Sequence, residues 1–325
     1  MKIGLLISEE GDPSWQKLFF WIKSFGHEPI VIYDKELIDN LGLILLFEDG
    51  NPSFCMKDIY GNLIDLDKID IFFQRKWNGN LFHSINSFDK AFENQEIMAL
   101  RDFILHDLKI KGKLVGFCTK DSNNKLIQLS TAQRIGLNIP KTVITNAKKK
   151  LTNRFINNKF IIKAMDGVYL NINENKILTN YTERIKLPEI ETDFFCSMFQ
   201  LEIEKKTELR VFYFLGNFYS VASISNDINE EVDIRILIAE NKVEYYPFDL
   251  PKSIKVKIVE LMMELDLDMG SLDFIVDKSE NYYFIDLNPF GQISMLSSTC
   301  FPYIEKDIVT NLIIQHEKKS KNIVN

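Results

Sequence analysis

The sequence is poor in cysteine and carries no excess of basic residues. Its 325 residues contain four cysteines, Cys55, Cys118, Cys196 and Cys300, which are far apart and form no CxxC pair. This spacing argues against a zinc knuckle and a disulfide framework, and it favours a reducing compartment. The formal net charge is −7 with a pI near 5.3, whereas a nucleic-acid backbone is held by a broad basic field. We therefore expect no nucleic-acid partner.

Long apolar runs are also absent. No stretch approaches the roughly 18 apolar residues that a membrane-spanning helix needs. The opening MKIGLLISEEGD has only a short apolar run followed by acidic residues, unlike a secretory signal peptide. We expect neither a membrane partner nor export, and so a cytoplasmic protein.

Several motifs that mark common enzyme classes are missing. The sequence has no GxxxxGK[ST] loop and no GxGxxG after a strand, so it lacks the phosphate cradles of P-loop and dinucleotide-binding folds. The histidines are scattered, and neither GxSxG nor HExxH accompanies them. Hydrolase triads and zinc proteases are therefore not expected.

The first third of the chain alternates apolar runs with helical patterns. Residues 3–8 form an apolar run, a helical pattern follows and ends at Gly26, and the strand-like EPIVIYD comes next. Further apolar runs at GLILLFED and DIFFQRKW are separated by polar loops, which is typical of an α/β layer. We expect an N-terminal α/β domain over residues 1–117.

Residues 118–325 predict a second domain of mixed α/β (α+β) class. A helix begins after the capping residues of KDSNNKLIQL and ends at Gly136. Short strands are predicted for KTVITN, KFIIK and FFCSMFQLEI, and a hairpin that turns at Gly216 and Asn217 for ELRVFYFLGNFYSVASIS. An amphipathic helix is predicted for KSIKVKIVELMMELDLD, before a last pair of strands.

This last pair of strands places two carboxylates opposite each other. The run SLDFIVDKSENYYFIDLNPFGQ has a polar turn near Ser279 and Glu280, and an antiparallel hairpin folded there sets Asp273 opposite Asp286. Directly opposed residues have Cβ atoms roughly 5 Å apart, so the two carboxylates repel each other unless a cation lies between them. Asn288 lies two residues further on, on the same face of the strand.

These oxygen donors fit magnesium better than zinc. Magnesium usually takes one or two carboxylates and completes its octahedron with water and phosphate oxygens. The hairpin therefore predicts a Mg²⁺ site at Asp273, Asp286 and Asn288 that serves a nucleotide. The alternative is that both acids are solvated hairpin ends, the common case for an arbitrary pair of acids. The apolar flanks argue against that alternative, because buried acids need a partner.

The order of motifs over residues 118–305 resembles the ATP-grasp fold. A helix-opening NK is followed by the strand KFIIKAMDG, the hinge FQLEIEKKTELRV, and finally LDF and DLNPFGQ. Within that superfamily, FQLEIEKKTELRVFYFLG and DLNPFGQ look most like graspetide synthetases, the microviridin-type and grasp-with-spasm peptide maturases. The resemblance implies a pre-ATP-grasp domain over 1–117 and an ATP-grasp domain over 118–325, divided into a lid subdomain (138–203) and a C-terminal metal-binding subdomain (204–325).

The resemblance also implies a role for each residue that matches an ATP-grasp position. Lys125 and Lys163 match the two lysines that touch ATP phosphates, and the compact lysine ammonium suits a phosphate. The implied ATP-binding set further contains Gln200, Leu201 and Ile203 at the adenine and Glu208 at the ribose. The implied catalytic set, near the transferred phosphate, is Lys163, Arg210 and Arg235.

Ordinary alternatives stay open for several of these residues. A single lysine is usually solvated, although Lys163 ends an otherwise apolar strand. Residues 199–203 equally fit a plain sheet strand that is followed by an exposed Glu208. Arg235 equally fits an ion pair with Asp233.

One further motif lies in the first domain, where QRKWNGN (residues 74–80) ends an apolar run. Related ligases carry an arginine- and tryptophan-bearing stretch there, which places Arg75 against the substrate. The alternative, which we prefer, is that Trp77 packs at a domain interface while Arg75 and Lys76 are solvated.

The implied reaction is ATP-dependent ligation within a ribosomally made precursor peptide that consists of a leader and a core. A peptide Asp or Glu carboxylate attacks the γ-phosphate of ATP, and a hydroxyl or amine then displaces phosphate from the acyl phosphate, which closes an ester or amide ring. Metal ions, lysines and arginines stabilise the phosphoryl transfer, and a lid excludes water. The related ligases also suggest a homodimer.

Two other functions share the same ATP residues. One is a ligase that adds an amino acid to a small molecule or a protein, and the other is a non-catalytic nucleotide-binding module. Retention of both lysines and the metal set argues against the second. The sequence departs from the family pattern in two places: Asp286 stands where many ATP-grasp enzymes have glutamate, and the lid around Asp166 and Gly167 is not glycine-rich.

Overall fold

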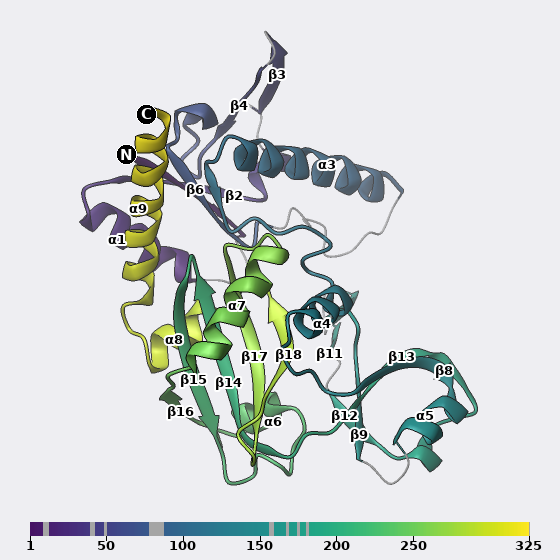
Figure 1. The fold of residues 1–325 in the computed structure, drawn as a ribbon. Helices are drawn as coiled ribbons and strands as arrows, with labels where there is room; N and C mark the ends of the chain where they lie inside the picture. The colour runs from purple at the N-terminus through teal and green to yellow at the C-terminus, as the bar shows by residue number, and fades with distance from the viewer. Residues whose placement is uncertain are drawn as a thin grey trace. The chain divides into compact units, whose positions relative to one another are not determined.

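The computed structural model describes residues 1–8, 13–39, 43–48, 51–77, 88–155, 159–166, 169–173, 176–179 and 182–324. These residues form two compact units, Met1–Phe117 together with Gln292–Asn325, and Cys118–Gly291 (Figure 1). The segment from Gln292 onward belongs to the first unit, whereas the sequence assigned it to the second domain. The functional domain borders therefore stay a prediction.

The first unit is built on four parallel strands, β1 (Lys2–Ile7), β2 (Glu28–Tyr33), β6 (Ile71–Arg75) and β7 (Leu114–Val115). They lie in the order β2-β1-β6-β7. Five of the six residues of β1 are buried, which is the pattern of a parallel strand that is covered on both faces. The predicted succession of strand, helix and strand is confirmed, because α1 (Ser14–Ser24) connects β1 to β2.

The other elements of this unit surround the parallel sheet. A smaller antiparallel sheet has the order β3-β4-β5, with β3 (Ile44–Glu48), β4 (Asn51–Lys57) and β5 (Leu63–Asp65). The helices are α2 (Glu36–Asp39), α3 (Phe88–Ile110), α8 (Ile293–Thr299), α9 (Ile304–Val324) and the 3₁₀ helix η1 (Leu66–Lys68). Among them, α9 packs against α1 (Figure 1).

The interpretation that Arg75 is solvated is wrong. Arg75, at the end of β6, is 1 % exposed, and Trp77 is fully buried. Trp77 belongs to the core of its own unit, in one cluster with Leu6 and Phe72. Sequence reasoning missed this because the apolar strand IFFQR is buried along its whole length, including its two polar residues. Residues 78–80 of the same motif lie outside the described part of the chain.

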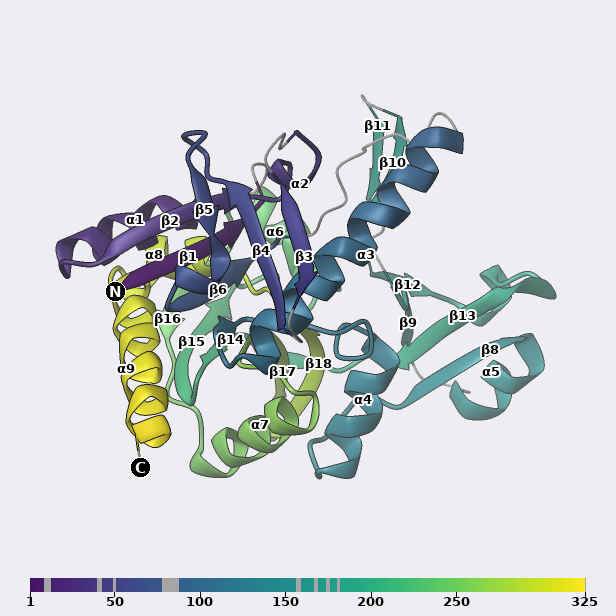
Figure 2. The same cartoon turned by 90° about the horizontal axis from the view of Figure 1, so that it is seen from above.

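The second unit contains a four-stranded antiparallel sheet in which the strands have the order β12-β9-β13-β8 (Figure 2). The elements of this part are β8 (Thr142–Ala147), α5 (Lys148–Phe155), β9 (Phe160–Lys163), β12 (Glu183–Ile185), η2 (Leu187–Glu189) and β13 (Asp193–Leu201). A separate hairpin joins β10 (Tyr169–Asn173) to β11 (Lys176–Thr179). Leu151, Phe160, Ile190 and Phe199 form the buried core of this part.

The second sheet of this unit has five antiparallel strands in the order β16-β15-β14-β17-β18. They are β14 (Lys205–Phe214), β15 (Asn217–Ile224), β16 (Glu244–Pro247), β17 (Met269–Asp277) and β18 (Tyr282–Asn288). The predicted hairpin of β14 and β15 is confirmed, but it turns at Leu215 and Gly216, one residue before the predicted Gly216 and Asn217, because Asn217 pairs with Phe214 as the first residue of β15. The helices of this part are α4 (Lys125–Arg134), α6 (Ile234–Ala239) and α7 (Lys252–Glu264).

The two faces of the five-stranded sheet differ in chemistry. Leu272, Phe274 and Val276 of β17 join a buried cluster with α7, which crosses in front of the sheet in Figure 1. Because side chains alternate along a strand, Asp273 and Ile275 point to the opposite face, where both line a pocket. Burial of one face therefore fixes which polar residues the other face presents.

Gly291 follows the end of β18, and we expect its replacement to destabilise the protein. Gly291 has φ +56, and an added Cβ would lie 2.9 Å from the Phe212 ring and 2.9 Å from Ser271 Oγ. Gly291→Ala should lower the free energy of unfolding by about 2–5 kcal/mol, the sum of left-handed backbone strain and overpacking. Urea denaturation measures this change. Gly216→Ala is the matched control, since its φ is +88 but nothing lies within 4 Å of an added Cβ. An equal loss in both variants would contradict tight packing at Gly291.

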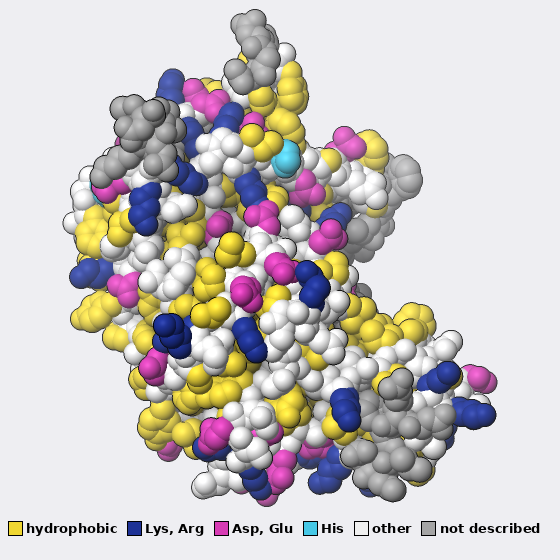
Figure 3. Space-filling model, viewed as in Figure 1, with side chains coloured by type: hydrophobic (Ala, Val, Ile, Leu, Met, Phe, Trp, Pro, Cys, Tyr) yellow, Lys and Arg dark blue, Asp and Glu magenta, His cyan; other side chains and the backbone are white. Residues whose placement is uncertain are grey.

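Charged side chains of both signs are mixed on the face shown in Figure 3. In the described part of the chain, no helix is long and apolar enough to cross a membrane.

Candidate functional site

A pocket in the unit Cys118–Gly291 is lined by residues from its four-stranded and its five-stranded sheets. β9 and β13 contribute from the four-stranded sheet, and β14, β17 and β18 from the five-stranded one. Nine residues that the sequence singled out line this pocket: Lys163, Gln200, Leu201, Ile203, Glu208, Arg210, Arg235, Asp273 and Asp286. Two others, Lys125 and Asn288, are not among the lining residues.

The predicted register of the last hairpin is confirmed. Asp273 on β17 is paired directly with Asp286 on β18, and a register shift follows between Asp273 and Phe274. The chain turns between the strands at residues 278–281, where Glu280 has a positive φ of 62°. Strand pairing on the other side of β17 sets Arg210 of β14 opposite Asp273. Three neighbouring strands thus place Arg210, Asp273 and Asp286 in one row.

Asp286 lies against two ammonium groups. Its Oδ2 is 3.3 Å from Lys125 Nζ and 3.5 Å from Lys163 Nζ. Burial would raise the pKa of Asp286, but the two lysines outweigh it and hold that pKa below its usual value. The predicted helix start brings Lys125 there, because Asn124 caps α4 by accepting hydrogen bonds from the backbone of Leu126 and Ile127. The two predicted phosphate lysines therefore lie at one carboxylate.

Asp273 is held by Arg210 through both of its oxygens. Arg210 Nε donates to Oδ1 at 2.9 Å and a terminal nitrogen donates to Oδ2 at 3.2 Å. The negative charge of Asp273 raises the pKa of Arg210, against the effect of burial, so the guanidinium stays charged. Neither acid of the hairpin is an isolated solvated end, because cations accompany both.

Asn288 is engaged elsewhere. Its side-chain oxygen accepts hydrogen bonds from the backbone N–H groups of Phe290 at 3.1 Å and Gly291 at 3.3 Å. No group of three or more His, Cys, Asp and Glu side chains is placed to hold a metal ion within the residues that the structure describes. Asp273 and Asp286 are the directly paired carboxylates of the pocket, and two carboxylates would fit a magnesium ion that takes its other ligands from water and phosphate. The contribution of Asn288 stays a prediction.

The predicted adenine segment ends β13 at the pocket. Gln200 is 1 % exposed, and its side-chain amide donates to Thr142 Oγ1 at 3.1 Å. Leu201 and Ile203 line the pocket with Ile161. Glu202, between them in sequence, accepts hydrogen bonds from Arg184 Nε at 2.9 and 3.0 Å. The apolar side chains of Ile161, Leu201 and Ile203 suit contact with a flat base.

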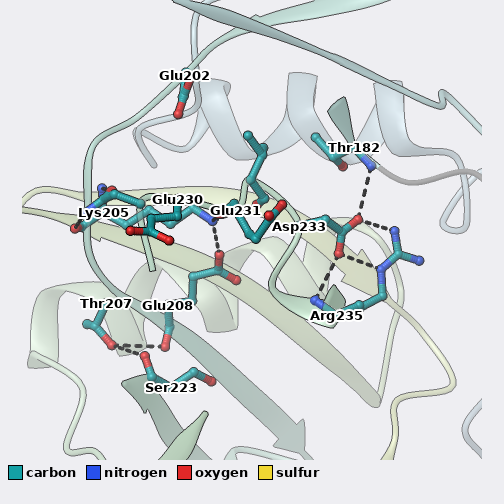
Figure 4. A network of polar contacts seen from close by, with 12 residues as sticks. Thr182, Glu202, Lys205, Thr207, Glu208, Ser223, Glu230, Glu231, Asp233 and Arg235 are labelled. Carbon is teal, nitrogen blue, oxygen red and sulfur yellow. Dashed lines mark hydrogen bonds and ion pairs between the residues drawn. The ribbon is translucent and has the colours of Figure 1, made fainter. Parts of the chain in front are cut away.

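Glu208 has a buried partner that sequence reasoning missed. Lys205 is 5 % exposed, and its Nζ donates to Glu208 Oε1 at 2.6 Å (Figure 4). Burial raises the pKa of Glu208, although Lys205 opposes that rise. No local signal identifies Lys205, because strict alternation sends residues three apart to opposite faces. A register shift between Lys205 and Thr207 changes that alternation.

Arg235 lines the pocket and also forms the ion pair that was its alternative interpretation. Arg235 Nε donates to Asp233 Oδ1 at 2.8 Å (Figure 4). Asp233 also caps α6 by accepting from the Arg235 backbone N–H, and it accepts from the Thr182 backbone N–H at 3.1 Å. Burial would raise the pKa of Asp233, but these hydrogen bonds lower it. The ion pair with Asp233 is therefore present, and the role of Arg235 at the transferred phosphate stays a prediction.

Comparison with solved structures defines the class of fold. No protein-family model matches the sequence, and no curated protein is significantly similar to it in sequence. Solved structures of ATP-grasp ligases nevertheless match nearly the whole chain. Their sequence identities to this chain are only 20 %, 22 % and 17 %, so the likeness concerns the fold. The predicted ATP-grasp fold is confirmed.

The individual structures are peptide ligases. The macrocyclase MdnC from Microcystis aeruginosa MRC, bound with precursor peptide MdnA, matches with a TM-score of 0.79 and 20 % identity over 96 % of this chain and 99 % of that one. A Chryseobacterium gregarium RiPP-associated ATP-grasp ligase, in complex with ADP and a leader and core peptide, matches with 0.79 and 22 % over 97 % of both chains. The ATP-grasp ligase PsnB, complexed with a phosphomimetic variant of minimal precursor, Mg and ADP, matches with 0.73 and 17 % over 96 % of this chain and 98 % of that one.

Proposed function

We propose that this protein is an ATP-dependent ligase that joins carboxylates to hydroxyls or amines within a ribosomal precursor peptide. It activates Asp or Glu side chains of the core as acyl phosphates and closes ester or amide cross-links. The observation that carries this proposal is the direct pairing of Asp273 with Asp286 in one pocket with Lys163 and Arg210. Carboxylates that can hold a metal ion, together with nearby cations, suit the charge that develops in phosphoryl transfer.

The ion pairs of the pocket suggest how a nucleotide is received. Each proposed phosphate-binding cation is paired with an acid: Lys125 and Lys163 with Asp286, and Arg210 with Asp273. The cations exchange these acids for phosphate oxygens when the nucleotide binds, and the two acids are then free to hold magnesium. Bound Mg²⁺ supplies charge neutralisation and orientation of the phosphates. The exchange keeps every buried charge compensated, which a buried ion needs.

The remaining pocket residues take the parts that the family resemblance gives them. Gln200, Leu201 and Ile203 receive adenine, and Glu208 accepts hydrogen bonds from the ribose hydroxyls. Arg235, which is held by Asp233, stabilises charge on the transferred phosphate in this proposal. No side-chain nucleophile is needed, because the peptide carboxylate itself attacks the γ-phosphate. The peptide hydroxyl or amine then attacks the acyl carbon, and phosphate leaves.

The compared ligases support the peptide as substrate. MdnC is bound with precursor peptide MdnA, and the Chryseobacterium gregarium ligase with ADP and a leader and core peptide. We extend both ligands, a leader-plus-core precursor and an adenine nucleotide, to this chain as part of the proposal. We also propose a homodimer in the cytoplasm, by analogy with the related ligases.

The test is ADP release from magnesium-ATP with a precursor peptide encoded beside the gene, together with mass spectrometry of that peptide. Peptide-dependent ADP release with loss of one water per ring is the expected result. A mass gain would instead indicate addition of an amino acid, the alternative ligase activity. Nucleotide binding with no turnover on any acceptor would favour the non-catalytic module and overturn the proposal.

A further inference from the structure

The loop between β15 and α6 is held by two cations at four consecutive carbonyl oxygens. Arg184 donates to the carbonyl oxygens of Asn229, at 2.5 Å, and Glu230. Lys205 Nζ donates to the carbonyl oxygens of Glu231 at 3.3 Å and Val232 at 2.7 Å. These residues belong to neither a helix nor a strand, so side-chain cations take the place that N–H groups of regular structure would have.

Both cations are themselves bound to carboxylates that line the nucleotide pocket. Arg184 pairs with Glu202, which is 14 % exposed, and Lys205 pairs with Glu208. The side chain of Asn229 fixes Lys205 further, because it accepts from the Lys205 N–H at 2.8 Å and donates to its carbonyl oxygen at 2.9 Å. The loop is thereby tied to the adenine end of the pocket through Glu202 and to the ribose end through Glu208.

The held loop leads directly to Asp233 and Arg235. Asp233 begins α6 as its cap, and Arg235 follows in the first turn. A displacement of the preceding carbonyls would therefore displace the pocket's guanidinium. Figure 4 shows the contact between Lys205 and Glu208, with the loop residues Glu230 and Glu231 drawn beside it and Asp233 and Arg235 to the right.

We propose that Lys205 and Arg184 are positioning residues: together they fix the loop that presents Asp233 and Arg235 to the pocket, and Lys205 also orients the Glu208 carboxylate for the ribose. This inference rests on the proposed function: its binding arm needs only the nucleotide site at Glu208, and its turnover arm also needs the peptide ligase activity. Loss of an ion pair that only stabilises the fold would weaken nucleotide binding and turnover together. Replacement of Lys205 should instead change nucleotide binding, and replacement of Arg184 should change turnover while nucleotide binding is kept. Lys205 contacts both the loop and Glu208, the proposed ligand of the ribose, whereas Arg184 contacts the loop and Glu202.

The nucleotide-binding arm uses ADP and 2′-deoxy-ADP with magnesium, measured by calorimetry on the full chain. Lys205→Met should weaken ADP binding by about tenfold and remove most of the preference for ADP over 2′-deoxy-ADP, because hydrogen bonds to charged groups are among the stronger ones. Lys206→Met is the matched control, since Lys206 is the next residue but is 54 % exposed and paired with Glu280. An unchanged preference for ADP in Lys205→Met would overturn the role at the ribose.

The turnover arm uses Arg184→Met. This variant also keeps the proposal testable if Lys205→Met does not fold, since Lys205 is buried. The Arg184 side chain is 37 % exposed, so we expect this variant to fold and to bind ADP within about threefold of wild type. Its kcat should fall about tenfold, because the loop that leads to Arg235 loses the two carbonyl contacts that Arg184 makes. Lys186→Met, at an 82 % exposed side chain just after β12, should keep the wild-type kcat. A wild-type kcat in Arg184→Met would overturn the loop role. If the wild-type enzyme itself turned over no peptide, the proposed function would fail while the ADP arm still tested Lys205.

Discussion

Replacing Asp286 with asparagine is expected to lower kcat for ADP release about a thousandfold, a loss of ~4 kcal/mol of transition-state stabilisation. Asparagine keeps the shape of the side chain but removes the charge that faces Lys125 and Lys163. A divalent cation beside Asp273 then loses one of the two directly paired carboxylates. Steady-state ADP release at saturating magnesium and ATP measures the effect.

A binding experiment separates this effect from misfolding. In Asp286→Asn the two lysines no longer have their carboxylate partner, so ADP without magnesium should bind at least as well as to wild type. The additional affinity that magnesium confers on the wild-type protein should be lost. The control is Glu280→Gln, which removes an exposed acid in the turn of the same hairpin and should leave kcat unchanged. Retention of more than a tenth of the wild-type kcat in Asp286→Asn would refute the metal role.

The second large effect is expected at Lys163. Lys163→Met should lower kcat/KM for ATP about a hundredfold, ~2.7 kcal/mol, because a partly buried ammonium on a phosphate forms charge-assisted hydrogen bonds. The Lys163 side chain is 14 % exposed, and its Nζ lies 3.5 Å from Asp286 Oδ2. Initial-rate kinetics with varied ATP measures the change.

Two comparisons make this prediction specific. Lys159→Met changes an exposed lysine just before the same strand, outside the pocket, and should behave as wild type. The double variant Lys163→Met with Asp286→Asn should lose less than the product of the single losses, since both residues act in one charge cluster. Strict additivity would mean that the two residues act independently.

Two parts of the site could be predicted from local pattern, whereas the other site residues were predicted from the resemblance to the ATP-grasp family. A period of two and a polar turn were enough to pair Asp273 with Asp286. The cap at Asn124 and the apolar spacing behind it were enough to start α4 at Lys125. Both features involve residues that are near one another in the chain. Side-chain alternation and helix capping therefore determine them, and few other local arrangements fit the same residues.

The interactions that sequence reasoning missed join segments whose adjacency no local pattern specifies. Arg184 reaches the carbonyl of Glu230 from another sheet, and Lys205 meets Glu208 only because a register shift reverses the usual alternation. Arg75 was also missed because its environment depends on tertiary packing: the whole strand β6 is buried, so Arg75 is not exposed to solvent. Strand order and bulges follow from how complete sheets pack their apolar faces. The sequence therefore predicted the ATP-grasp fold and nine of the residues that line the pocket, whereas the arrangement that holds Asp233 and Arg235 there arose only once the sheets were assembled.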